Sequence, residues 1–317
     1  MTILETVIPV FLMIALGKFL KAKDIISDKG IACIKSISTN VFLPVMAFDT
    51  LIHGNFSVDS LILIALEIFV LFTAYGLGFF FKRFFDPEIN GYVPYAMPTY
   101  EGGLFGWALI ALILAPVGGS KSEAMFSIIS MDIFSGVFCF TFLSTGLKFL
   151  AGQKMTRKEI AISIVTNPLI ISVILGFIGA FCHWGEIIDN SIFAGLYTKT
   201  TDMFIKPLSP MILICIGSGL VFNWDVLKKG LKLAAFRYAL QIILCALTLT
   251  IIAFTLGLSP DLKVALLVYF FCPTSFLLSM YATEQKAIEF TSGYLSLQIL
   301  ISLIIFSGVS IYASQIL

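Results

Sequence analysis

The sequence predicts an all-α integral membrane protein with ten transmembrane helices in two inverted five-helix repeats. Three observations lead to this: an apolar composition, ten apolar segments of membrane-spanning length, and basic residues that alternate between the connections. Hydrophobic residues make up 59% of the 317 residues, charged residues only 12%, and the mean hydropathy is +1.01. Soluble domains carry about 25% charged residues, so we expect this chain to lie in a lipid bilayer.

Each apolar segment is close to the length of about 20 residues that a helix needs to cross a bilayer. Basic residues follow the first segment and do not precede it, so we expect it to remain in the mature protein. The longest polar connection, Lys148 to Glu159, divides the chain into repeats of residues 1–150 and 151–317. The ten segments are 2–21, 31–52, 60–81, 91–115, 123–147, 160–182, 196–221, 233–256, 261–282 and 288–314.

Basic residues predict the orientation, because cytoplasmic connections of membrane proteins are enriched in lysine and arginine. The connections after odd-numbered segments carry 13 of them, whereas those after even-numbered segments carry only Lys121 and Lys263. We therefore expect the odd connections in the cytoplasm and both termini on the extracellular or periplasmic side of the plasma membrane. Because each half has five crossings, the two halves are inverted with respect to each other.

Short patterns support the repeat, because they recur in the same order in both halves. Gly and Pro are common in membrane helices, so the shared order of the patterns carries more weight than any one of them. The paired patterns are Pro9 with Gly17 and Pro168 with Gly176, Asn40 with Pro44 and Lys206 with Pro210, and Met97-Pro98-Thr99 with Cys272-Pro273-Thr274.

Segment four contains the features that point to a binding site. Between Gly91 and Pro116 it is apolar, yet prolines and glycines interrupt its helix and the carboxylate Glu101 lies inside the interruption. Broken backbone in a membrane is stable only where protein or a water-filled cavity satisfies its polar groups. The stretch from Val264 to Glu284 repeats this design. Two interrupted segments at matching places in two halves are typical of a transporter's substrate site.

Several motifs together resemble the auxin efflux carrier family, which includes plant auxin exporters and bacterial malate permeases. The resemblance covers nearly the whole chain. It depends on IPVFLMIALGKFL, NVFLPVMAF, PTYEGGLFGWAL, NPLIISVILG, SPMILICIGSGL and CPTSFLLSMYATE followed by LSLQILISLI.

The resemblance implies a fold similar to that of bile-acid sodium symporters, with helices four and nine broken and crossing at the midplane. It also implies a small organic anion as substrate. The chain departs from the family pattern in segment four. It has Glu101 where many members have an asparagine, and Ala108 where they have a proline.

Broken helices can bind ions at their exposed ends. N-terminal ends suit a carboxylate and C-terminal ends suit a cation. The hydroxyls of Thr99, Thr274 and Ser275 either line such a site or bond back to their own helices. The candidate substrate-binding residues are Asn40, Pro98, Thr99, Glu101, Gly102, Gly103, Pro273, Thr274, Ser275 and Lys206, and the candidate ion-coupling residues are Glu101 and Asp132.

Acidic residues inside membrane segments usually mark ion pathways. We interpret Glu101 and Asp132 as proton- or cation-binding groups, against the alternatives of a structural acid in the break and an interhelical hydrogen bond. Glu67 is equally compatible with function and structure. Lys206 either reaches the crossover or pairs with Asp202, four residues earlier.

Three other basic residues, Lys18, Lys35 and Arg237, lie within a few turns of the cytoplasmic side. We expect them to extend toward the membrane surface.

The hypothesis that follows is a secondary active transporter of a small organic anion, malate-like or another carboxylate, that is proton-coupled or driven by the membrane potential. A sodium-coupled symporter would use Thr99, Glu101, Ser275 and Gln298 as oxygen ligands. A non-transporting membrane sensor is a third option. No nucleic-acid partner, enzyme activity, metal or cofactor is indicated, and a homodimer is one option for the assembly.

Overall fold

The computed structural model describes residues 3–54, 58–150, 152, 156–220, 224–275, 278 and 285–317. Every regular element in these residues is helical, as predicted. Five helical stretches are long and apolar enough to cross a membrane, so the chain is an all-helical protein that fits a bilayer. These stretches are Asp28–Ile52, Val58–Phe84, Ala194–Gly219, Gly230–Thr255 and Glu289–Ile316.

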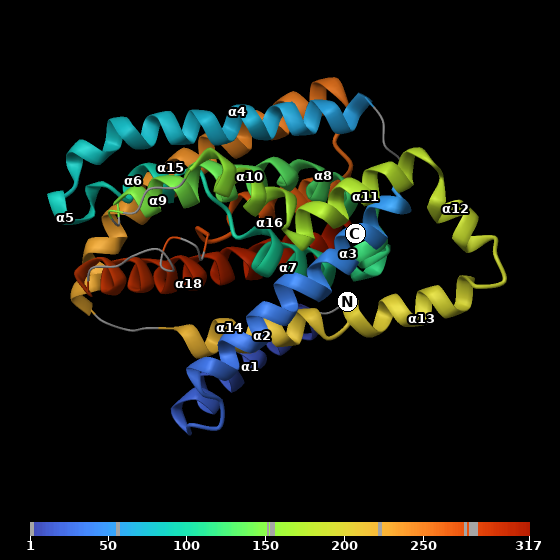
Figure 1. The fold of residues 1–317 in the computed structure, drawn as a ribbon, viewed down its shortest axis with the longest axis horizontal. Helices are drawn as coiled ribbons and strands as arrows, with labels where there is room; N and C mark the ends of the chain where they lie inside the picture. The colour runs from blue at the N-terminus through green and yellow to red at the C-terminus, as the bar shows by residue number, and fades with distance from the viewer. Residues whose placement is uncertain are drawn as a thin grey trace.

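Helices occupy each of the ten predicted segments within the described residues (Figure 1). Residues 276–277 and 279–282 of segment nine lie outside the described residues. The helices are α1 Ile3–Ala22, α2 Asp28–Ile37, α3 Leu43–Ile52, α4 Val58–Phe81, α5 Pro87–Asn90, α6 Val93–Ala96, α7 Trp107–Ile113, α8 Glu123–Phe138, α9 Ser144–Leu150, α10 Arg157–Val165, α11 Pro168–Phe181, α12 Trp184–Asp189, α13 Ala194–Ile205, α14 Leu208–Gly219, α15 Trp224–Thr255, α16 Pro260–Phe270 and α18 Gln285–Ile316.

Interruptions are more widespread than the sequence predicted, because segments two, five, six and seven are also irregular. In segment two a π-helical turn, Ser38–Phe42, precedes Pro44, which has no N–H to donate to the previous turn. In segment six the helix restarts at Asn167, whose side chain accepts from the N–H groups of Leu169 and Ile170. Segment seven is interrupted between α13 and α14 at Pro207.

Two helix pairs bring the halves of the chain together. α1 packs along α14, and α3 packs along α11. In the first pair Gly17 faces the carbonyl group of Ile214, and Gly217 faces that of Ile14, so closely that a β-carbon on either glycine would collide with backbone. Such close approach through small residues is a common way for membrane helices to associate.

The interrupted segments four and nine lie in the interior. α16 packs on α8 and α18, and α7 contacts α8, α16 and α18. Figure 1 shows α7 and α16 in the middle of the molecule. The breaks are therefore enclosed by helices from both halves.

Gly217→Ala should weaken the α1–α14 contact, because the added methyl group has to displace the backbone of Ile14. We expect a loss of about 1–3 kcal/mol in the free energy of unfolding, measured by thermal unfolding of the purified protein. Gly219→Ala in the same helix is the control, since a β-carbon there meets no other atom within 4 Å. Equal stability of the two variants would contradict the close contact.

Candidate functional site

The two chain breaks meet directly. After α6 the chain is non-helical until residue 102, and after α16 it is non-helical through Ser275. The backbone N–H of Glu101 donates to the carbonyl of Pro273 at 2.8 Å. The hydroxyl oxygens of Thr99 and Thr274 are 2.8 Å apart, and both side chains are fully buried. The matching Pro-Thr motifs of the two halves are thus in contact.

Side chains satisfy the carbonyl groups that the first break frees. The Thr99 hydroxyl donates to Tyr95 O at 3.0 Å, so the back-bonding alternative is present. The Thr274 hydroxyl reaches Ala96 O at 3.3 Å, and Gln241 Nε2 donates to Met97 O at 3.1 Å. Each bond compensates a carbonyl that would otherwise lack a partner in an apolar interior.

The position of Arg237 differs from the one that the sequence predicted. We expected it to extend toward the membrane surface, but its side chain is fully buried. Its Nη2 donates to Thr99 O at 2.8 Å and to Cys272 O at 3.1 Å, and Nη1 donates to Gln298 Oε1 at 2.7 Å. The prediction failed because distance from the helix end does not say which face of α15 a residue occupies.

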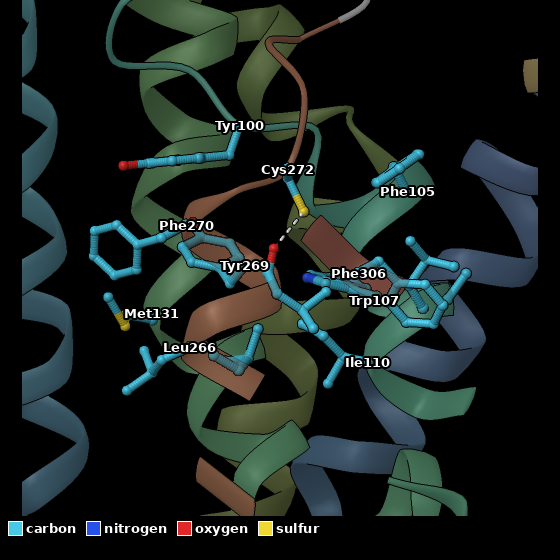
Figure 2. Close-up of a cluster of buried hydrophobic side chains, with 14 of the residues drawn as sticks. Tyr100, Phe105, Trp107, Ile110, Met131, Leu266, Tyr269, Phe270, Cys272 and Phe306 are labelled. Atoms are coloured by element: carbon cyan, nitrogen blue, oxygen red, sulfur yellow. Dashed lines mark hydrogen bonds between the residues drawn. The ribbon is translucent and has the colours of Figure 1, made fainter. Parts of the chain in front are cut away.

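Aromatic side chains pack beneath the breaks. Figure 2 shows Tyr100, Tyr269 and Phe270 in one buried cluster, with the rings of Tyr100 and Tyr269 5.0 Å apart. The Tyr100 hydroxyl donates to Gln241 Oε1 at 2.5 Å, and the Cys272 thiol donates to Val268 O at 3.3 Å. The cluster therefore supports the breaks mechanically and also supplies polar partners.

Glu67, Asp132 and Tyr269 form a buried group beside the breaks. The Tyr269 hydroxyl lies 3.0 Å from Glu67 Oε1 and 2.7 Å from Asp132 Oδ1. A hydroxyl has one proton to donate, so both contacts are hydrogen bonds only when one carboxyl is itself protonated. Glu67 is fully buried, and its second oxygen has no hydrogen-bond partner among the described residues. This geometry suits carboxyl groups that share a proton.

A cavity of about 950 Å³ reaches the breaks. Glu101 and Asp132 both lie on its wall, so the two candidate ion-coupling residues face one space. Of the candidate substrate-binding residues, four more contribute to the wall. They are Asn40, Gly102, Gly103 and Ser275.

The remaining candidates lie elsewhere. Pro98, Thr99, Pro273 and Thr274 hold the breaks together and do not contribute to the cavity wall. Lys206 is 74% exposed in its side chain, lies outside the cavity, and pairs with Asp202 at 2.8 Å, which was the alternative interpretation.

Two lysines expected at the surface differ in position. Lys18 donates to Leu220 O at 2.7 Å, whereas Lys35 lines the cavity.

Arg237, Gln241 and Tyr269 are site residues whose roles sequence reasoning missed. Arg237 and Gln241 are polar residues four positions apart, hence on one helix face, near the start of an otherwise apolar segment. That spacing was the available signal. A comparison of the chain with protein-family models and with curated proteins found no match.

A double-mutant cycle tests the proton-sharing group. Glu67→Leu and Tyr269→Phe remove the two ends of one buried hydrogen bond, so their effects on unfolding free energy should be non-additive by about 0.5–3 kcal/mol. Glu67→Leu combined with Tyr312→Phe, a tyrosine near the chain's C-terminus, should be additive and serves as the control. Additive effects in the first cycle would show that Glu67 and Tyr269 do not interact.

Proposed function

We propose that this protein is a secondary active transporter that moves a small organic anion by alternating access at the contact between the two breaks, coupled to protons. The observation that carries this proposal is the cavity of about 950 Å³ that ends on Glu101, Asp132 and the glycines of the first break. Its volume falls within the range of about 300–1,000 Å³ of small-molecule sites.

In this proposal the anion binds where the helix of segment four begins again after its break. A π-helical turn, Gly102–Gly106, leads directly into α7, so helix runs from 102 to 113. The first N–H groups of a helix have no partner within it and carry partial positive charge. Gly103 lines the cavity and has no side chain to cover those groups, whereas the Asp132 carboxyl fills the space in which a side chain of Gly102 would lie. A substrate carboxylate can therefore approach the backbone closely at Gly103.

The acids explain why protons would be coupled to such a substrate. Ionised Glu101 and Asp132 on the cavity wall would repel an anion, whereas a protonated carboxyl can donate a hydrogen bond to it. Binding of the anion and of a proton therefore favour each other by linkage. Tyr269 connects Asp132 to Glu67, which offers the proton a second buried acceptor.

The helix contacts support the inverted repeat within this proposal. In an inverted repeat, segment one corresponds to segment six and segment two to segment seven. The contact of α1 (segment one) with α14 (segment seven) therefore corresponds to the contact of α11 (segment six) with α3 (segment two), and both contacts are present. Segments three, four and five correspond in the same way to segments eight, nine and ten, and two further pairs of contacts match. These are α4–α8 with α15–α18, and α16–α8 with α7–α18.

The cavity's position supports an inward-facing conformation. Lys35 and Ser36 lie in α2, which follows the first lysine-rich connection, and Ser292 lies shortly after Lys286 in α18. Asn167 follows the mid-chain connection. All four line the cavity and lie toward the side that the basic residues assign to the cytoplasm. Alternating access then requires a second conformation that opens to the other side.

Binding of malate, as a test dicarboxylate, should tighten as the pH falls, because protonation of Glu101 removes repulsion and adds a donor. Glu101→Gln imitates the protonated acid, so it should bind malate with a flatter pH dependence yet fail in proton-coupled uptake. Affinity against pH in purified protein and uptake in proteoliposomes measure the two effects. An unchanged pH profile in Glu101→Gln would remove Glu101 from coupling, and binding that weakens at low pH would indicate a cationic substrate.

Accessibility to a membrane-impermeant thiol reagent tests the orientation and the inward-facing state. In a variant without native cysteines, Ser36→Cys and Ser292→Cys should react in inside-out vesicles and resist in intact cells. Asn190→Cys, in the connection after segment six, should show the reverse pattern and is the control. Reaction of all three positions from the same side would contradict the inverted arrangement.

A further inference from the structure

We infer that Arg237 is the resident cation of the two breaks, a tethered charge whose donors satisfy carbonyl groups that a metal cation could otherwise coordinate. It follows that the protein needs no sodium ion to hold the breaks together. This concerns the architecture of the crossover and holds whether or not the chain transports an anion.

The guanidinium joins both breaks and a third helix at once. One nitrogen, Nη2, donates to Thr99 O in the first break and to Cys272 O in the second. The other, Nη1, donates to Gln298 Oε1 in α18, and Gln298 in turn donates to the Tyr294 hydroxyl at 2.5 Å. Both backbone carbonyls lie just past the ends of α6 and α16, where helical hydrogen bonding has stopped. A charged donor makes stronger hydrogen bonds to such oxygens than a neutral one does.

No carboxylate balances this charge directly. Among the described residues, Arg237 forms no salt bridge, although it is fully buried. A buried charge requires compensation by ionic or hydrogen-bonding partners. Here the compensation comes from two backbone carbonyls, one side-chain amide and the ring faces of Tyr100 and Tyr238, each 5.6 Å from the guanidinium carbon. These carbonyl, amide and aromatic groups therefore compensate the charge in place of a carboxylate.

Three further carbonyls of the breaks also accept hydrogen bonds from protein donors. Gln241 donates to Met97 O, the Ser302 hydroxyl to Phe271 O at 2.6 Å, and the Glu101 N–H to Pro273 O. A sodium ion needs several oxygen atoms that are free to coordinate it. Of the four residues that the sodium-coupled alternative would use, Glu101 and Ser275 line the cavity. The other two are engaged at the breaks: Gln298 Oε1 accepts from Arg237, and Thr99 Oγ1 donates to Tyr95 O and contacts Thr274 Oγ1.

The planar guanidinium is suited to this position in a way that an ammonium is not. Its fork of donors reaches three acceptors on three chain segments in fixed directions, whereas lysine offers a point charge on a flexible stem. Arg237→Lys therefore retains the charge but loses part of the bonding. Arg237→Gln loses the charge as well.

Thermal unfolding of the full-length protein in detergent tests this role. The wild type should unfold at the same temperature in NaCl and in choline chloride of equal ionic strength. Arg237→Gln should unfold several degrees lower, and Arg237→Lys should lie between Gln and wild type. The control is Arg83→Gln, because Arg83 is exposed and lies over the Phe80 ring, away from the breaks. It should unfold like the wild type.

Two results would overturn the role of Arg237. One is stabilisation of the wild type by sodium over choline, which would show that a mobile cation has its own place. The other is an Arg237→Gln variant as stable as Arg83→Gln, which would show that the breaks do not depend on the fixed charge. If Arg237→Gln cannot be purified, two measurements still test the role of Arg237. They are the unfolding temperature of Arg237→Lys and the comparison of NaCl with choline chloride on the wild type. Because the readout is unfolding, failure of the transport proposal is detected separately by the uptake measurements.

Discussion

Two helices that stop inside an apolar interior leave carbonyl groups without partners, and most of the site can be understood from how those groups are satisfied. A buried unpaired carbonyl costs free energy comparable to a lost hydrogen bond. Here the donors come from neighbouring helices: Gln241 and Arg237 from α15, Ser302 from α18, and the Thr99–Thr274 pair from the breaks themselves. Because these helices surround both breaks, the contact between the halves is a property of the whole fold.

The same constraint separates structural from functional polar groups. The carbonyl groups of Met97, Thr99, Phe271, Cys272 and Pro273 accept hydrogen bonds from protein donors. The N-terminal end at Gly102 and Gly103 faces a cavity, and its acids, Glu101 and Asp132, face it too. Arg237 and its neighbours thus bond to carbonyl groups at the breaks, while the proposed ligand site lies on the cavity side of Gly103. This division gives the proposed proton coupling a physical basis, because the only way for such acids to adjoin an anion favourably is to carry protons.

Prolines and glycines act in both parts of this design. In the breaks, Pro98 and Pro273 remove N–H donors and end the preceding helices. Between α1 and α14, Gly17 and Gly217 allow backbones to touch. A transporter that rocks between two conformations needs rigid bodies joined at a defined contact. The glycine-mediated helix pairs are suited to form such bodies, while the interruptions near Pro44, Pro168 and Pro207 are places where a helix can bend.

Composition and periodicity alone determined the helical membrane class, the positions of the segments, and the two interruptions at Met97-Pro98-Thr99 and Cys272-Pro273-Thr274. These properties are local, because hydropathy over about 20 residues and the chemistry of proline do not depend on distant partners. Glu101 and Asp132 were identifiable for the same reason, since a carboxyl in an apolar segment is conspicuous by itself. Only the tertiary structure decided which polar residues reach the breaks. Arg237 and Lys206 both lie in or near apolar segments, yet one is fully buried between three helices and the other is exposed beside Asp202. The difference depends on which face each helix turns toward its neighbours, and that is set by packing across more than 130 residues of sequence.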